Sequence, residues 1–178
     1  MKYFELYEMP VSFLTDEKHL KKKYLELSKK SHPDFYTLES TEKQNEILAS
    51  STLNNKAYQT LNDFDKRIKY ILSEKGYLVE EEKYVLPQIF LMEMLDLNEL
   101  VLEVEFNPAK GDEVEKHLAD AHKNLRSEIH ITLENFDETK AEAEVYQRIK
   151  EFYYKRKYLL RIQEQLDKFA TDKSDASI

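Results

Sequence analysis

The sequence contains no cysteine and very little glycine or proline, and each shortage excludes a class of site. Because cysteine is absent from the 178 residues, a disulfide, a thiolate metal site and a cysteine nucleophile are all excluded. The two glycines, Gly76 and Gly111, cannot supply either of the glycine-rich loops that cradle nucleotide phosphates. Few residues are left to interrupt regular structure, so the abundant Leu, Glu and Lys predict long helices.

Charge and hydropathy narrow the range of partners. The chain has 27 Lys and Arg against 35 Asp and Glu, and its formal net charge of −8 disfavours general nucleic-acid binding. The densest apolar stretch, residues 85–97, contains two carboxylates and a glutamine and is too short to cross a bilayer. The first residues, Met1 to Glu5, already carry charge and do not begin an apolar signal segment. We therefore expect a cytoplasmic protein with no nucleic-acid or membrane partner.

The first helical block is predicted to begin with a basic helix. Thr15 is the expected N-cap of this helix, which runs to about Lys30. The helix must end there because Pro33 disfavours helical geometry in the residue before it and cannot donate a backbone hydrogen bond. Residues 33–40 lack periodicity and predict a loop.

Two further helices are predicted after this loop. Thr41 and Gln44 form a capping box that opens a long helix. A shorter helix follows Asp63, and Gly76 is a favourable residue for its C-terminal end. The expected inward positions are Leu48, Leu53, Ala57 and Leu61 on the long helix, and Phe64, Ile68, Ile71 and Leu72 on the shorter one.

The second block predicts three amphipathic helices joined by short connections, which is typical of an antiparallel bundle. The first begins at Pro87 and runs to about residue 105, Asp112 caps the second, and Asp137 caps the third. The inward positions of the last two helices are Leu118, Leu125, Ile129, Leu133, Val145, Ile149, Phe152, Leu159 and Leu166. The fold class is therefore all-α, in four segments: a helical-hairpin domain at 1–76, a linker at 77–86, a three-helix bundle at 87–170 and a flexible tail at 171–178.

The helix that begins at Pro87 carries more apolar residues than one face needs. At about 100° per residue, its core stripe consists of Phe90, Met94, Leu97, Val101 and Val104. A second stripe of Leu91, Leu95 and Leu102 either packs on the third helix or forms a binding surface. Met92 is harder to place in a core, and a flexible methionine near carboxylates suits a partner-binding patch.

The most specific motif is His32-Pro33-Asp34 in the loop between the first two long helices. Proline fixes the backbone, a carboxylate suits a bidentate arginine contact, and histidine can donate and accept hydrogen bonds. The preceding helix is locally basic through Lys18, Lys21, Lys22, Lys23, Lys29 and Lys30. Such a patch would steer an acidic partner surface toward the loop.

This arrangement resembles the J-domain of heat-shock co-chaperones, including the run Leu-Asn-Asn-Lys-Ala-Tyr-Gln-Thr-Leu at residues 53–61. The resemblance implies that the chain stimulates ATP hydrolysis by a DnaK/HscA-type heat-shock chaperone. It also implies that the chain is not itself an enzyme and needs no cofactor or metal. The chaperone-binding residues would be His32, Pro33 and Asp34 together with the six lysines.

A more specific resemblance covers nearly the whole chain. Residues 3–7 (Tyr-Phe-Glu-Leu-Tyr), 67–72 (Arg-Ile-Lys-Tyr-Ile-Leu) and 90–97 (Phe-Leu-Met-Glu-Met-Leu-Asp-Leu) are similar to the HscB family of iron–sulfur cluster assembly. This similarity implies that the C-terminal bundle binds an IscU-like cluster scaffold. The implied scaffold-binding residues are Leu91, Met92, Leu95, Asp96, Glu99 and Tyr158, with Tyr153 and Tyr154 as alternatives to the last.

Three other readings remain open from the sequence. The chain could be a J-domain co-chaperone for another client, or a helical adaptor without J-domain activity. It could also be a helical metalloenzyme, although His117, His122 and His130 do not share one helix face and lack the Glu-x-x-His pattern of di-iron bundles.

Overall fold

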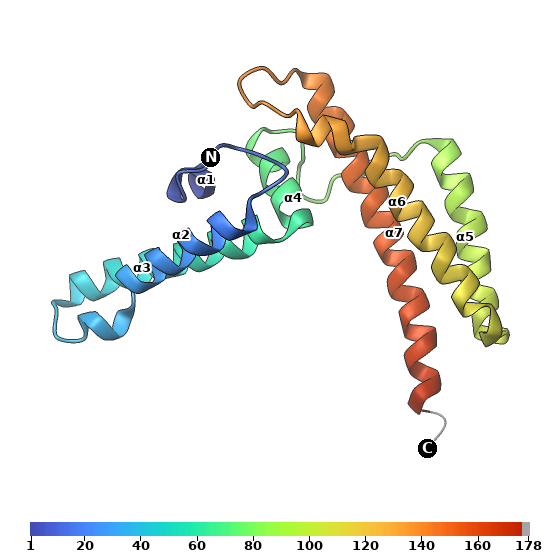
Figure 1. The fold of residues 1–178 in the computed structure, drawn as a ribbon, viewed down its shortest axis with the longest axis horizontal. Helices are drawn as coiled ribbons and strands as arrows, with labels where there is room; N and C mark the ends of the chain where they lie inside the picture. The colour runs from blue at the N-terminus through green and yellow to red at the C-terminus, as the bar shows by residue number, and fades with distance from the viewer. Residues whose placement is uncertain (176–178) are drawn as a thin grey trace. The chain divides into compact units, whose positions relative to one another are not determined.

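The computed structural model describes the backbone of residues 1–175 and the side chains of residues 1–169. Every regular element in that part of the chain is helical, which confirms the all-α prediction (Figure 1). The elements are α1 (Lys2–Leu6), α2 (Glu17–Lys30), the 3-10 turn η1 (Pro33–Tyr36), α3 (Thr41–Asn62), α4 (Phe64–Glu74), α5 (Gln88–Phe106), the 3-10 turn η2 (Pro108–Lys110), α6 (Gly111–Glu134) and α7 (Ala143–Asp175).

The chain forms two compact units. The first combines Met1–Val79 with Leu133–Glu142, and the second combines Glu80–Thr132 with the residues that follow Glu142. The segment 133–142, predicted to be part of the bundle, therefore belongs to the first unit. Its Phe136 ring meets the Phe13 ring edge-on with centroids 4.6 Å apart, and its Glu138 carboxylate lies 2.7 Å from the Lys75 ammonium.

The first unit is built on an antiparallel hairpin of α2 and α3, which lie side by side (Figure 1). Its core includes the fully buried side chains of Phe4, Tyr7, Phe13, Leu20, Leu61, Ile68, Ile71 and Leu72. Arg67 on α4 is also buried, and its guanidinium donates from Nε to the carbonyl oxygen of Phe13 at 3.0 Å. Burial lowers the pKa of Arg67.

The predicted helix starts are displaced by one residue. Asp16, not Thr15, caps α2, because its carboxylate accepts the backbone N–H groups of Lys18 and His19 at 3.0 and 3.1 Å. Ser40, not Thr41, caps α3 by accepting the N–H of Lys43 at 3.3 Å. In both cases two neighbouring residues could cap a helix, and the backbone conformation decides which one does.

The predicted inward stripe of α3 is correct at its C-terminal end and wrong at its N-terminal end. Ala57 and Leu61 are buried, but Leu48 is 57% exposed and Ile47 is buried in its place. Asn54, a polar residue that hydrophobic periodicity overlooks, is 2% exposed in the same stripe. At the end of α4, Gly76 has a φ of +74°, a left-handed conformation that glycine adopts without a steric penalty.

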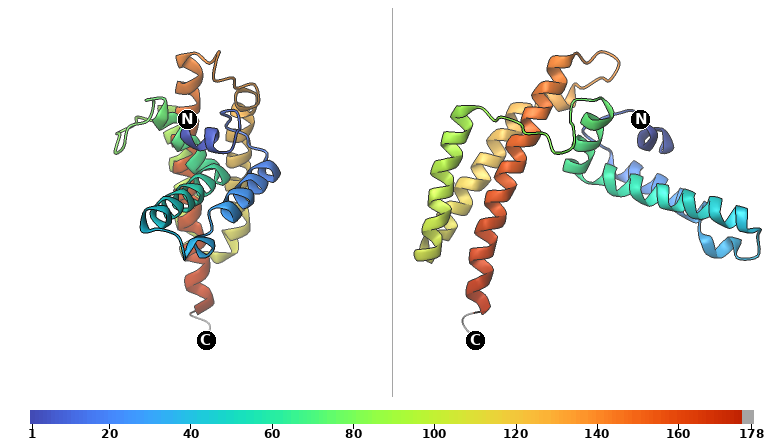
Figure 2. Two further views of the ribbon diagram at one scale, coloured as in Figure 1. Left: turned by 90° about the vertical axis from the view of Figure 1, so that its left-hand side faces the viewer. Right: turned by 180° about the vertical axis from the view of Figure 1, so that it is seen from behind.

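The second unit contains α5, α6 and α7, which run antiparallel beside one another (Figure 2). The predicted core stripe of α5 is confirmed, since Phe90, Met94, Leu97, Val101 and Val104 are all buried. Pro87 is the residue that precedes α5, so the helix begins one position later than predicted.

The segment 77–86, predicted as a linker, makes contacts with α7. The buried Lys150 ammonium donates to Glu82 at 2.5 Å, and the Tyr84 and Tyr154 rings stack with centroids 4.4 Å apart. Helix α7 continues to Asp175, so the predicted tail from Thr171 is helical in its first residues, and residues 176–178 lie outside the described part of the chain.

Asp137 does not cap α7, contrary to the prediction. Its carboxylate instead accepts the backbone N–H and the hydroxyl of Thr139 at 2.9 and 2.6 Å, closing a turn six residues before α7 starts at Ala143. The hydrogen bond from the Thr139 hydroxyl, followed by that from Lys140, lowers the pKa of Asp137 from 3.8 to about 2.

Candidate functional site

The corner formed by His32, Pro33 and Asp34 is exposed at the end of the α2–α3 hairpin (Figure 1). His32 precedes η1 with an extended backbone, and its Nδ1 accepts the N–H of Asp34 at 3.4 Å. Pro33 starts η1, a position where its missing N–H is not needed. The Asp34 carboxylate is 3.6 Å from His32 Nδ1 and remains open to solvent. The corner thus offers one imidazole and one carboxylate in a defined arrangement.

Hydrogen bonds hold the loop behind this corner. The Tyr36 hydroxyl donates to the carbonyl oxygen of Lys30 at 2.8 Å, which ties the loop to the last turn of α2. The Gln44 side-chain amide donates to the carbonyl oxygens of Thr37 and Glu39 at 3.2 and 3.0 Å, which ties it to the first turn of α3. The loop is therefore connected to both helices that carry it.

Five of the six lysines predicted to contact a chaperone are exposed: Lys18, Lys21, Lys22, Lys29 and Lys30. Lys23 differs, because it is half-buried and forms an ion pair with Glu8. The hydrogen bond between the two raises the pKa of Lys23 and lowers the pKa of Glu8. Lys23 therefore contributes less free charge to the basic patch than its neighbours do.

The residues predicted to bind a scaffold lie on the outer side of α5. Met92 and Leu95 are 61% and 59% exposed, Leu91 is 38% exposed, and the side chains of Asp96 and Glu99 are open to solvent. Exposed apolar side chains next to carboxylates form a surface that can bind a partner by apolar burial and orient it by charge.

The tyrosines of α7 differ in their surroundings. Tyr158 is partly exposed and meets the Phe90 ring of α5 edge-on, with centroids 6.0 Å apart. Tyr153 is 7% exposed, and Tyr154 stacks against Tyr84. Tyr158 is therefore in ring contact with the helix that carries the predicted scaffold patch.

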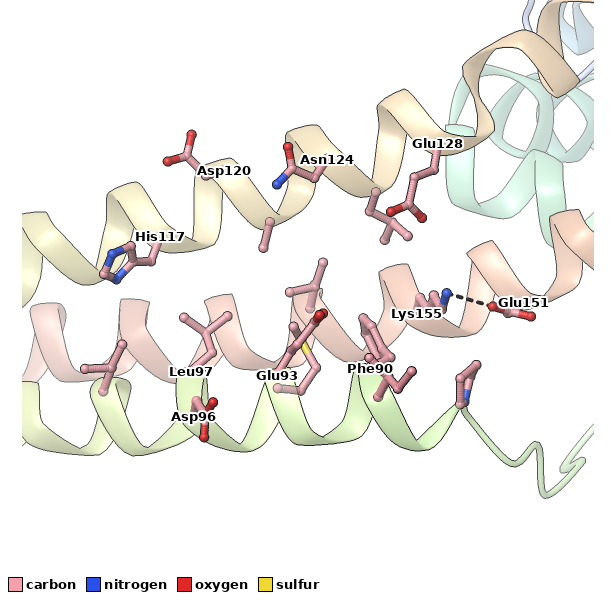
Figure 3. Close-up of a pocket in the computed structure, with 17 residues that line it drawn as sticks. Phe90, Glu93, Asp96, Leu97, His117, Asp120, Asn124, Glu128, Glu151 and Lys155 are labelled. Atoms are coloured by element: carbon pink, nitrogen blue, oxygen red, sulfur yellow. Dashed lines mark ion pairs between the residues drawn. The ribbon is translucent and has the colours of Figure 1, made fainter.

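An unpredicted groove lies among α5, α6 and α7 (Figure 3). It has a volume of about 690 Å³ and an apolar floor that includes Phe90, Met94, Leu97, Leu125 and Leu159. Carboxylates border it: Glu93 and Asp96 from α5, Asp120 and Glu128 from α6, and Glu151 from α7, which pairs with Lys155 at 2.7 Å. Only Asp96 belongs both to this groove and to the predicted scaffold patch. Periodicity identifies helix faces but not the spacing between helices, so no signal in the sequence indicates the groove.

Within the described residues, no group of three or more His, Asp or Glu side chains is arranged to hold a metal ion. His117 and His130 on α6 are exposed, and His122 is half-buried. Among those same residues, no helix is both long enough and apolar enough to span a membrane.

A family model and two relatives match this chain, and all three carry the HscB name. Residues 86–167 match the family model described as the HSCB C-terminal oligomerisation domain. The "Co-chaperone protein HscB homolog" of Psychromonas ingrahamii is 32% identical over 152 residues, which cover 84% of this chain and 89% of that protein. The homolog of the same name from Vibrio cholerae is 35% identical over 100 residues, covering 56% and 58%.

Two solved structures share the fold. The chaperone HscB from Vibrio cholerae aligns with a TM-score of 0.75 at 22% identity and covers 97% of this chain and 99% of its own. The human co-chaperone protein HscB aligns with a TM-score of 0.77 at 28% identity, covering 93% and 80%.

Proposed function

The chain belongs to the HscB family of co-chaperones, and on that premise we propose that it presents an IscU-like iron–sulfur cluster scaffold to a DnaK/HscA-type heat-shock chaperone. It stimulates ATP hydrolysis by the chaperone and catalyses no reaction itself. The observation that carries this proposal is the exposed corner of His32, Pro33 and Asp34, held by hydrogen bonds to α2 and α3.

The chemistry of the corner supports a role in docking. A carboxylate such as Asp34 is suited to a bidentate contact with an arginine of the partner, and such contacts are both directional and strong. Because Pro33 fixes the backbone and the loop is tied to two helices, little conformational entropy is lost on binding. By binding the hydrolysis-competent conformation of the chaperone better than the other conformation, the co-chaperone shifts the equilibrium toward hydrolysis.

The basic helix supports fast encounter. Lys21 and Lys22 lie in the middle of α2, and Lys29 and Lys30 lie in its last turn beside the corner. These cations attract an acidic partner surface over a distance set by ionic strength.

The outer face of α5 supports scaffold binding. Met92 and Leu95 are exposed large apolar side chains, and Asp96 and Glu99 add charge that can select one orientation. Truncating a central anchor of such an interface typically weakens binding by at least about 1 kcal/mol, equivalent to roughly fivefold in affinity.

The experiment is steady-state ATP hydrolysis by a DnaK/HscA-type chaperone, with this protein added in the presence and absence of scaffold. His32→Gln is expected to abolish stimulation while circular dichroism shows that the fold is retained. Met92→Ala and Leu95→Ala are expected to weaken scaffold binding at least about fivefold and to leave stimulation without scaffold unchanged.

Matched controls accompany each variant. His130→Gln, at an exposed position on α6, should stimulate like wild type, and Ile131→Ala, an exposed apolar residue of α6, should bind scaffold like wild type. Full stimulation by His32→Gln would contradict the chaperone role. Unchanged scaffold affinity in both α5 variants would instead leave a J-domain co-chaperone that serves another client.

A further inference from the structure

His32 and Phe35 lie in one row along the loop that carries the corner. In a 3-10 turn, side chains three residues apart lie nearly above one another. The loop has this hydrogen-bond pattern, because the N–H of Phe35 donates to the carbonyl oxygen of His32 at 3.1 Å. The side chains agree with it, since the ring centroids of His32 and Phe35 are 5.5 Å apart.

Leu38 lies in a second turn, directly after η1. Thr37, which follows η1, keeps right-handed helical angles of φ −63° and ψ −23°, and the N–H of Glu39 donates to the carbonyl oxygen of Tyr36 at 3.1 Å. Leu38 therefore lies inside a turn of the same i→i+3 type, three residues after Phe35 in the chain. We refer to His32, Phe35 and Leu38 together as the loop ridge.

The two apolar members of the loop ridge are open to solvent. Phe35 is 73% exposed and Leu38 is 100% exposed. The loop that carries them is held in place. The Tyr36 hydroxyl is hydrogen-bonded to the end of α2, and the Gln44 amide is hydrogen-bonded to the backbone on both sides of Leu38. Hydrogen bonds thus hold the loop in a conformation that exposes two apolar side chains to solvent.

We infer that the loop ridge is the apolar anchor by which this protein binds the chaperone, with Phe35 at its centre. This inference rests on the proposed function, because it concerns the same partner. A surface that covers His32 and Asp34 must also cover Phe35, which follows Asp34 in the chain and whose ring is next to the imidazole. Desolvating that ring favours binding only if the partner offers it an apolar contact.

The ridge defines the chemistry of the partner surface. The partner must have an apolar depression for Phe35 and Leu38, a cationic group for Asp34, and carboxylates opposite Lys29 and Lys30, which are exposed at the adjoining helix end. A chaperone with a uniformly polar surface at this place would bind weakly even if it could respond to His32. Phe35 and Leu38 therefore add affinity and selectivity among chaperones, whereas His32 and Asp34 are required for the response.

The test is a titration of chaperone ATPase activity with increasing amounts of full-length co-chaperone. Phe35→Ser and Leu38→Ser should each raise the concentration for half-maximal stimulation, by at least about tenfold for Phe35 and less for Leu38, while the maximal rate stays at the wild-type level. Phe35→Leu, which keeps an apolar side chain, should recover most of the affinity.

The control is Val79→Ser, which removes an apolar side chain of similar exposure, 65%, from the other end of the same unit and should leave the titration unchanged. If wild type stimulates but Phe35→Ser titrates like wild type, the anchor is refuted and the proposed function stands. If Phe35→Ser lowers the maximal rate at an unchanged half-maximal concentration, Phe35 belongs to the response and the anchor is again refuted. If wild type itself fails to stimulate, the proposed function fails.

Discussion

Asn54 connects three parts of the first unit through one buried side chain. Its Nδ2 donates to the carbonyl oxygen of Tyr24 at 3.1 Å and to the hydroxyl of Ser28 at 2.9 Å, both on α2. Its Oδ1 accepts the hydroxyl of Tyr7 at 2.8 Å. Burial raises the pKa of the Tyr7 phenol, so this hydroxyl keeps its proton and donates. The amide thereby fixes the hairpin that presents the loop.

Replacing this amide should therefore destabilise the protein. Asn54→Ala removes three side-chain hydrogen bonds, while the Tyr7 hydroxyl keeps the backbone carbonyl oxygen of residue 54 as an acceptor at 2.9 Å; the loss costs about 2–3 kcal/mol in the free energy of unfolding. Urea unfolding followed by circular dichroism measures the loss. Asn55→Ala is the control, because Asn55 is exposed and its side chain accepts one hydrogen bond, from the Tyr24 hydroxyl at 3.1 Å. Equal losses in the two variants would contradict the role of burial.

Asp137 gives the segment 133–142 a dependence on pH. Hydrogen bonds and the nearby Lys140 lower the folded-state pKa of Asp137 from 3.8 to about 2, so the folded state binds its proton less readily than the unfolded state. The carboxylate therefore stabilises the fold above about pH 4, and this contribution disappears as the pH falls to about 2.

Asp137→Asn should thus lower the urea midpoint at neutral pH, and the difference from wild type should shrink between about pH 4 and pH 2. Asp120→Asn, at an exposed position on α6, serves as the control and should show no comparable convergence. A midpoint difference for Asp137→Asn that stays constant down to about pH 2 would show that the turn does not depend on the charge.

Among the helices, the sequence predicts burial better than it predicts ends. The core stripe of α5 is correct in all its members because five apolar residues at helical spacing determine the phase of the helix. The predicted burial of Leu48 on α3 is wrong for two reasons. Few apolar residues precede Leu48 to determine the phase of the helix, and the polar residue Asn54 occupies an inward position. The exposed corner at residues 32–34 follows from Pro33, whereas the anchoring of its loop by Tyr36 and Gln44 depends on contacts that periodicity does not encode.

The start of α2 offers a direct test of one corrected helix end. Asp16→Ala should cost about 1 kcal/mol of stability, because two N–H groups of the first turn lose their acceptor. Thr15→Val should cost nothing or stabilise slightly, because the Thr15 hydroxyl is buried without a hydrogen-bond partner and valine has nearly the same shape. Thermal unfolding of both variants measures these changes in stability. A larger loss for Thr15→Val than for Asp16→Ala would show that Thr15 is the N-cap of α2.

Charge is distributed unevenly over the whole molecule. The formal net charge is −8, yet α2 carries six lysines against two glutamates. A cationic helix on an anionic protein both attracts an acidic partner and orients it toward the end of the hairpin, since the remaining surface repels it. The loop ridge and the basic helix then have separate roles: the helix accelerates encounter, and the ridge retains the partner.

This division predicts how chaperone stimulation depends on salt. The double variant Lys21→Glu and Lys22→Glu should need at least about tenfold more protein for half-maximal stimulation at low ionic strength, and the ratio to wild type should approach one near 1 M salt, where the Debye length is only about 3 Å. The control, Lys66→Glu and Lys69→Glu, changes the net charge equally at exposed positions on α4 and should keep a ratio near one throughout. Because each ratio compares proteins at the same salt, the chaperone's own response to salt cancels. Equal effects of the two double variants would mean that net charge, rather than the position of the lysines on α2, governs encounter.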